Sequence, residues 1–117
     1  MIFLLSKIPV KTIITNPPQS SSSILTTDTR LACGVRSDAS VSPVWRWFFY
    51  LEAQPGVYVK EGEIDGTSRR KRIQPDGTLI LTDLESGDSG IYECVVTSAG
   101  GNDSRNATLN VIGKLFR

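Results

Sequence analysis

The side chains in this sequence that could form a covalent link with each other are Cys33 and Cys94, its two cysteines. They can remain a buried pair of thiols or form a disulfide, and a disulfide implies an oxidising compartment. The chain has no histidine, the commonest general base and the commonest nitrogen ligand of metals. Its serines and acidic residues show no pairing suited to nucleophilic or acid–base catalysis. We therefore predict no enzyme activity, no metal site and no cofactor.

Two asparagines stand in acceptor triplets for N-linked glycosylation. The triplets are Asn-Asp-Ser at residues 102–104 and Asn-Ala-Thr at residues 106–108. Around the second triplet, apolar residues alternate along the chain and are expected to face inward, which turns Asn106 outward. Asn102 is expected at an exposed turn. We predict both asparagines as glycosylation sites.

The elements that must position these residues are short β-rich runs separated by turn signals, a pattern typical of sandwiches and barrels. We expect seven or eight strands and no helix. Residues 20–23, all serine, are either a flexible linker or, preferably, a polar bend. Residues 51–68 are expected to form a loose edge with one short strand around 57–59. The remaining strands are expected at residues 11–15, 30–35 and 45–50, in a hairpin at 69–81 around Asp76-Gly77, and in a hairpin at 91–112 around 99–101.

Tryptophan and tyrosine residues accompany the two cysteines in a pattern that identifies the fold. Trp45 and Trp47 share the inward parity of their run, so either can pack against a Cys33–Cys94 bridge, and we favour Trp47. Tyr92 precedes the second cysteine by two positions, which fits the tyrosine corner of immunoglobulin sandwiches. The sequence predicts an all-β, immunoglobulin-like β-sandwich of I-set type, with seven to eight strands in two sheets.

The polar residues before the second cysteine support the same interpretation. Asp88 is placed to pair with an arginine at the edge of the other sheet, and we expect Arg70 to be that arginine. Gly90 is expected to leave room for the Tyr92 ring. Three leucines are expected in the core beneath: Leu79, Leu81 and Leu84.

Residues 69–72, Arg-Arg-Lys-Arg, form the sharpest run of charge. The run matches a dibasic processing pattern and a heparin-type patch. The preferred interpretation is a solvated edge strand with one arginine pairing inward. Phe48 and Tyr50, with Val95 across from them, are expected on the outer face of a sheet, where exposed aromatics can mark a partner site. A glycan on Asn106 would shield that face.

The composition of the chain limits the classes of partner and the cellular location that we expect. The chain has 117 residues and a net charge of +1, so neither a nucleic-acid nor a membrane partner is indicated. No apolar stretch approaches the roughly 20 residues that cross a bilayer. The apolar start, residues 1–5, is too short for a secretory signal. We expect a fragment of a longer extracellular protein, without membrane insertion by the fragment itself.

Several segments resemble the sidekick family of immunoglobulin-superfamily adhesion molecules, in particular their last, sixth, immunoglobulin-like domain. The resemblance rests on Pro-Pro-Gln at 17–19, Cys-Gly-Val at 33–35 and the run at 98–107, which continues to Leu109 and Val111. More distantly, the spacing of Asp38, Ser40, Pro43 and Trp47 is similar to L1 and contactin domains. The resemblance covers residues 11–112, and residues 51–72 depart from it. Residues 1–10 match nothing, and residues 113–117 are expected to be a tail or linker.

The resemblance implies a module of a single-pass neuronal cell-surface protein that adheres homophilically at synapses. Sidekick proteins carry six immunoglobulin domains followed by fibronectin type III domains, and their homophilic contact belongs to the first four domains. A domain like the sixth is therefore expected to act mainly as a stalk or spacer between neighbouring immunoglobulin and fibronectin III domains. The alternatives are an independent ligand-binding domain and an intracellular sarcomeric-type domain.

Overall fold

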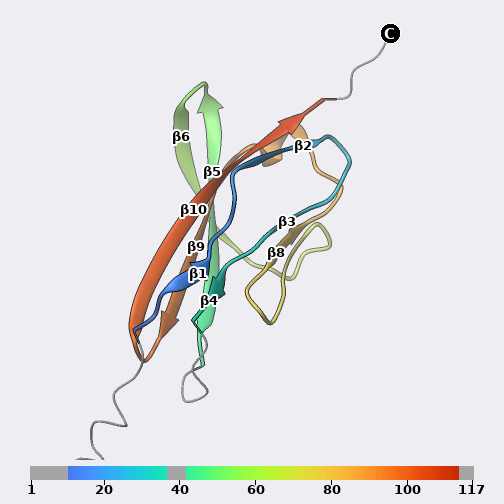
Figure 1. Cartoon of the computed structure of the whole chain (residues 1–117). Helices are drawn as coiled ribbons and strands as arrows, with labels where there is room; N and C mark the ends of the chain where they lie inside the picture. Colours follow the sequence, from blue (N-terminus) through green and yellow to red (C-terminus); the bar gives the residue numbers. More distant parts are fainter. Residues whose placement is uncertain (1–10, 37–41, 114–117) are drawn as a thin grey trace, which may run out of the picture.

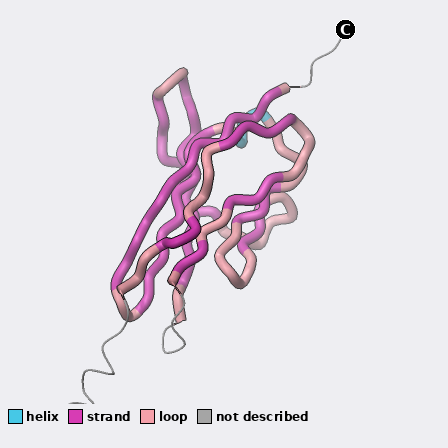
Figure 2. Tube along the Cα trace, viewed as in Figure 1, coloured by secondary structure: helices cyan, strands magenta, loops and turns pink. Residues whose placement is uncertain are grey.

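The computed structural model describes residues 11–36 and 42–113. The expectations for residues 1–10, for Asp38 and Ser40, and for residues 114–117 lie outside the described residues. Where the chain is described, it folds as a two-layered β-sandwich (Figures 1 and 2). No α-helix occurs in these two ranges, and a single 3-10 turn, η2 (Ser86–Asp88), precedes the ninth strand. The predicted all-β immunoglobulin-like fold is confirmed, although the described residues form ten strands where seven or eight were expected.

The larger layer is a five-stranded sheet in the order β2-β10-β9-β5-β6, and the smaller is a three-stranded sheet in the order β3-β8-β7. A further antiparallel pair, β1-β4, continues from β3. The strands are β1 (Ile14–Asn16), β2 (Ser21–Ile24), β3 (Thr29–Leu31), β4 (Gly34–Val35), β5 (Val44–Gln54), β6 (Val57–Ile64), β7 (Lys71–Ile73), β8 (Leu79–Leu81), β9 (Gly90–Ser98) and β10 (Gly101–Ile112).

Alternation of side chains along the strands builds the core between the layers. In β9 the buried residues are every second one, and the residues between them are partly exposed. The three leucines expected in the core are buried. The core cluster contains Ile14, Leu31, Cys33, Trp47, Phe49, Ile64, Leu79, Leu81, Leu84, Tyr92, Cys94, Val96 and Leu109.

The serine-rich segment is a strand, so its interpretation as a linker or a bend is wrong. Strand β2 pairs in parallel with the end of β10, with Ser21 opposite Leu109 and Ile24 opposite Ile112. An edge strand is held by backbone hydrogen bonds, which serine supplies as well as any other residue. The chain therefore changes partner at Pro17-Pro18, because β1 pairs with β4 and β2 pairs with β10.

Residues 51–64 are not a loose edge. Strand β5 continues to Gln54, and β6 pairs with it from Val57 to Ile64 with two register shifts. Gly56 has a φ of 77°, which allows the tight turn between the two strands. The distal part of this hairpin stands out from the sandwich (Figure 1). It has few buried side chains, so its composition looks like that of a loop.

Both expected hairpins are present, at β7–β8 and at β9–β10. In the first turn Gly77 alone supplies a positive φ, of 89°. Asp76 supports the turn through its side chain, because its Oδ1 accepts a hydrogen bond from the Thr78 amide at 3.0 Å. Hydrogen bonding to the backbone and the side chain of Thr78 lowers the pKa of Asp76 below its ordinary value.

Candidate functional site

A disulfide between Cys33 and Cys94 joins the two layers, as predicted. Its S–S distance is 2.15 Å, and the two Cα atoms are 6.6 Å apart. Cys33 lies between β3 and β4, and Cys94 lies in the middle of β9. Both cysteines are buried. With a sequence separation of 61 residues, the bond closes a loop that in the chain-entropy account stabilises the fold by about 4 kcal/mol.

Both tryptophans lie close to this bond, in different ways. Trp47 is fully buried and stands opposite Cys94 in the β5–β9 register, and its Nε1 donates to the Gly77 carbonyl at 2.8 Å. Trp45 is half-buried, and its Nε1 donates to the Cys33 carbonyl at 2.8 Å. A Cβ at Gly77 would lie 2.2 Å from Trp45 Nε1, so the turn can approach the indole only with glycine. The two indoles thus fix the turn of the smaller sheet against the larger one.

Tyr92 makes the packing contact and the hydrogen bond of the core at the end of the sandwich opposite the Gly77 turn. Its ring is fully buried, 4.8 Å from the Phe49 ring between centroids, and its hydroxyl donates to the Asp88 carbonyl at 2.6 Å. Burial raises the pKa of the Tyr92 phenol far above its ordinary value, so the hydroxyl stays a donor. The expectation for Gly90 needs correction. A Cβ there would meet the Tyr50 carbonyl at 2.1 Å and the Phe49 ring at 2.8 Å, so the space serves these groups and not the Tyr92 ring.

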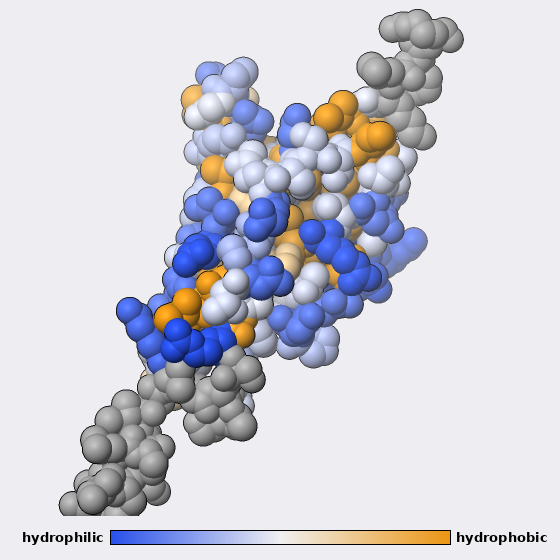
Figure 3. Space-filling view, viewed as in Figure 1, coloured by the Kyte–Doolittle hydropathy of each residue, from blue (hydrophilic) through white to orange (hydrophobic). Residues whose placement is uncertain are grey.

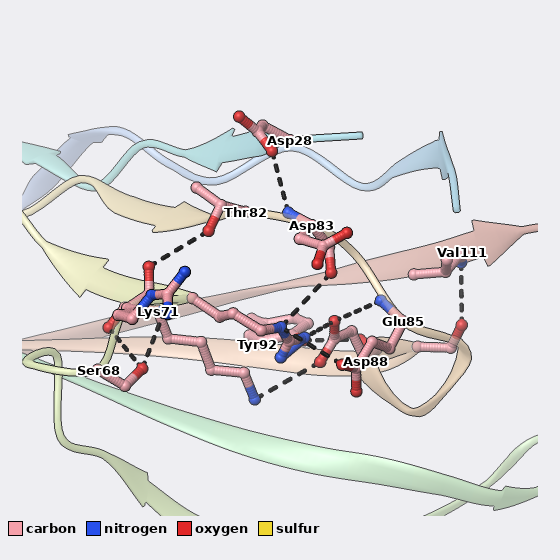
Figure 4. Close-up of polar contacts among 12 residues, drawn as sticks. Asp28, Ser68, Lys71, Thr82, Asp83, Glu85, Asp88, Tyr92 and Val111 are labelled. Carbon is pink, nitrogen blue, oxygen red and sulfur yellow. Dashed lines mark hydrogen bonds and ion pairs between the residues drawn. The ribbon is translucent and has the colours of Figure 1, made fainter. Parts of the chain in front are cut away.

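The structure brings Asp88 and Arg70 together. Figure 4 shows Asp88 beside Glu85 and Lys71. The Asp88 side chain is 6% exposed; its Oδ2 also accepts the Glu85 amide at 2.8 Å. A hydrogen bond to Asp88 raises the pKa of the Arg70 guanidinium. Lys71 Nζ lies 3.7 Å from Asp88 Oδ1. Two residues of the basic run therefore face Asp88 where one was expected: Lys71 at the start of the edge strand β7, and Arg70 directly before it.

The outer face of the five-stranded sheet carries Phe48 and Tyr50, both half-buried. Lys60 Nζ lies 4.6 Å from the Phe48 ring centroid and 5.7 Å from that of Tyr50. The Tyr50 hydroxyl donates to Glu93 at 3.0 Å, which raises the pKa of that phenol. The residue across from Phe48 is Glu93, whereas Val95 stands opposite Arg46, so the expected position of Val95 is wrong.

Sequence reasoning missed the charged residues that frame this face. Arg46 makes two hydrogen bonds to Glu63, at 2.8 and 3.1 Å, and its guanidinium lies 5.2 Å from the Phe48 centroid. These bonds raise the pKa of Arg46 and lower that of Glu63. Residues 57–64 are mostly polar or exposed, so their composition concealed the strand that carries Lys60 and Glu63. The face is a set of aromatic rings flanked by cations, not an apolar patch.

Asn102 and Asn106 are both exposed, and both lie within β10; Asn102 is not in the turn as expected. Four of the large exposed hydrophobic side chains in the described residues lie in pairs, Ile24 opposite Ile112 and Val57 two positions from Val59 in β6. Figure 3 shows orange patches on a visible face that is otherwise mostly hydrophilic. Within residues 11–36 and 42–113 no group of three or more acidic or cysteine residues is placed to hold a metal ion. In the same ranges no helix is long and apolar enough to span a bilayer.

Two sheets joined by a buried disulfide beside a tryptophan, with a tyrosine corner at one end, define an immunoglobulin-like domain. The sequence profile of the immunoglobulin I-set domain matches residues 13–111, and the chain belongs to this family.

Comparison with characterised proteins confirms the resemblance to sidekick proteins. The chain is 42% identical to protein sidekick-2 of Gallus gallus over 103 residues, which is 86% of this chain and 4% of the relative. It is 38% identical to protein sidekick of Drosophila melanogaster over 103 residues, 88% of this chain and again 4% of the relative. The chain thus spans a small fraction of the length of these relatives.

Solved structures share the fold at lower identity. The tandem immunoglobulin repeats of Dlar match with a TM-score of 0.71 and 20% identity, over 92% of this chain and 50% of that one. The complex of titin with an obscurin-like 1 immunoglobulin domain matches with a TM-score of 0.66 and 21% identity, over 90% of this chain and 97% of that one. At this identity the likeness concerns the fold alone.

Proposed function

We propose that the chain is an extracellular immunoglobulin-like module of a cell-surface adhesion molecule, and that it serves homophilic cell–cell recognition at synapses mainly as a stalk or spacer. The similarity to sidekick proteins over most of the chain carries this proposal. The position in the parent would correspond to the sixth immunoglobulin domain, between other immunoglobulin domains and fibronectin III domains. The partners are then the same parent molecule on another cell and these neighbouring domains.

The placement of the two ends of the domain supports a spacer. The amide of Thr12 donates to the carbonyl of Gly100 in the β9–β10 turn, at 3.4 Å. The carbonyl of Ile112 accepts the Leu25 amide at the other end of β10, at 2.7 Å. The two ends are therefore separated by the length of β10, which has 12 residues and so extends about 40 Å. Because the chain runs from one end of the domain to the other, the domain sets a distance between the domains on either side of it (Figure 1).

A replacement experiment in chicken sidekick-2 tests the spacer role. The matched segment is deleted, replaced by this chain, or replaced by a titin immunoglobulin domain of the same fold, and aggregation of cells expressing each version is measured. A spacer predicts that deletion weakens aggregation and that both replacements restore it equally, because length and geometry matter and surface chemistry does not. Restoration by this chain alone would contradict the spacer role and assign it a part in recognition.

A second candidate function is ligand binding by the outer face around Phe48 and Tyr50. The half-buried aromatic rings flanked by Arg46 and Lys60 favour it, since aromatic and arginine residues are enriched in interfaces. Self-association of the purified chain, measured by analytical ultracentrifugation, would support this face as a homophilic contact if Phe48→Ala abolished it. The sarcomeric alternative requires two free thiols, and the disulfide counts against it.

A further inference from the structure

The two glycosylation acceptors lie on one strand and project from one face. Asn102 and Asn106 are four positions apart in β10, so they share a side of the sheet, and both are exposed. In the register with β9, Asn102 stands opposite Thr97 and Asn106 opposite Glu93. Strand β2 pairs with β10 only from Leu109 onward. The sheet edge beside both asparagines is therefore not paired with β2. Ile14 and Ser20 approach this edge at Asp103 and Thr108, and both asparagine side chains remain exposed, which leaves room for attached sugars.

Cross-strand pairs connect each asparagine, through a residue of β9, to a residue of β5 on the outer face described above. Glu93 stands opposite Phe48 on β5, and Thr97 stands opposite Val44. Phe48 is half-buried, while Val44 is 58% exposed. Two strand spacings, about 10 Å, separate β10 from β5. A branched oligosaccharide on Asn106 thus reaches Glu93 and Phe48, and one on Asn102 reaches Val44.

The chemistry of this face suits a sugar. A pyranose ring presents C–H groups on its faces and hydroxyl groups around its rim. The Val44 side chain and the part of the Phe48 ring that Arg46 and Lys60 leave open offer apolar surface. The Glu93 carboxylate accepts the Tyr50 hydroxyl at Oε1 and can accept a further hydrogen bond at its other oxygen. The disulfide adds an independent observation, because an oxidising secretory compartment is also where asparagine-linked sugars are attached.

We propose that Asn102 and Asn106 both carry N-linked oligosaccharides, and that these cover the outer face of the five-stranded sheet from β10 to β5. The glycans then close this face to protein partners, Phe48 included. The inference needs only that the chain is secreted, and it does not depend on the adhesive role.

Mass spectrometry of the chain secreted from animal cells tests the attachment. Treatment with a peptide-N-glycosidase is expected to remove two glycans, and Asn102→Gln and Asn106→Gln are each expected to remove one. Asn110→Gln is the matched control, because Asn110 is exposed on the same strand but stands in no acceptor triplet. An unoccupied Asn102 or Asn106 in the folded, secreted chain would overturn the proposal.

Oxidative footprinting of the glycosylated chain, before and after enzymatic removal of sugars under native conditions, tests the coverage. Labelling of Phe48 is expected to rise severalfold once the sugars are removed. Tyr58, on β6 near the tip of the β5–β6 hairpin, serves as the internal control and is expected not to change. Equal labelling of Phe48 in both states would show that the sugars project away from the face and would overturn this part of the proposal. Neither result bears on cell aggregation, so the two proposals fail independently.

Discussion

The centre of the sandwich, defined as the buried space between its two layers, and the solvent-facing side of the β5–β6 hairpin use their polar groups in opposite ways. In the centre, the indole of Trp47 and the hydroxyl of Tyr92 are buried and donate to backbone carbonyls. No buried side-chain nitrogen or oxygen in the described residues lacks a hydrogen-bond partner. On the hairpin, Arg46 and Glu63 meet where both are about half exposed to solvent. Stability should therefore be concentrated in the centre, and the hairpin should tolerate change.

The largest effect is expected from removing the disulfide. The double variant Cys33→Ala, Cys94→Ala should lose about 4 kcal/mol of unfolding free energy, because the unfolded chain regains the freedom of the opened loop. Urea unfolding followed by tryptophan fluorescence measures the change. A loss below about 1 kcal/mol would mean that the disulfide hardly restricts the conformational freedom of the unfolded chain.

Asp88→Ala should come next, with a loss of about 2 kcal/mol. The substitution leaves Arg70 and Lys71 facing each other without their shared carboxylate and frees the Glu85 amide. The arginine side chain is 30% exposed, so water offsets part of the larger cost of breaking a buried pair. Glu61→Ala, at an exposed position of β6, is the control and should change little. Equal effects of the two variants would contradict the special role of the centre.

Tyr92→Phe should cost about 1 kcal/mol, because the Asp88 carbonyl loses its donor while the buried ring is kept. Tyr58→Phe provides the matched change on the hairpin, where the ring is half exposed. Thermal unfolding of both variants gives the comparison. The difference between centre and hairpin would disappear if both lowered the melting temperature equally.

The smallest effect is expected from Glu63→Gln on the hairpin. Hydrogen bonding to Arg46 lowers the pKa of Glu63 from its ordinary value of 4.5. The carboxylate therefore stabilises the fold above that value, and the contribution is lost as the pH falls through the lowered pKa. Melting temperatures of wild type and variant should differ slightly at neutral pH and converge in acid and in high salt. A large, salt-insensitive difference would show that the hairpin is not a solvated edge.

The sequence was sufficient to predict the core residues of the sandwich and insufficient to predict its edge strands. Cys33, Trp47 and Tyr92 could be assigned because large buried side chains recur with the period of a strand, and burial restricts which residues can occupy those positions. The serines of β2 and the polar residues of β6 carry no such restriction, because edge strands are held by backbone bonds. The position of Val95 opposite Arg46 depends on cross-strand register, which no single strand specifies.

The parallel pairing of β2 with β10 has a mechanical consequence. Tension applied to the two ends of the domain pulls these neighbouring strands in opposite directions along their length. The hydrogen bonds between residues 21–24 and 109–112 are then loaded together in shear, in series with the β1–β4 pair that precedes β2, and not one after another as in the peeling of a hairpin. The backbone pairing of these serines at the sheet edge thereby resists extension of the domain under tension.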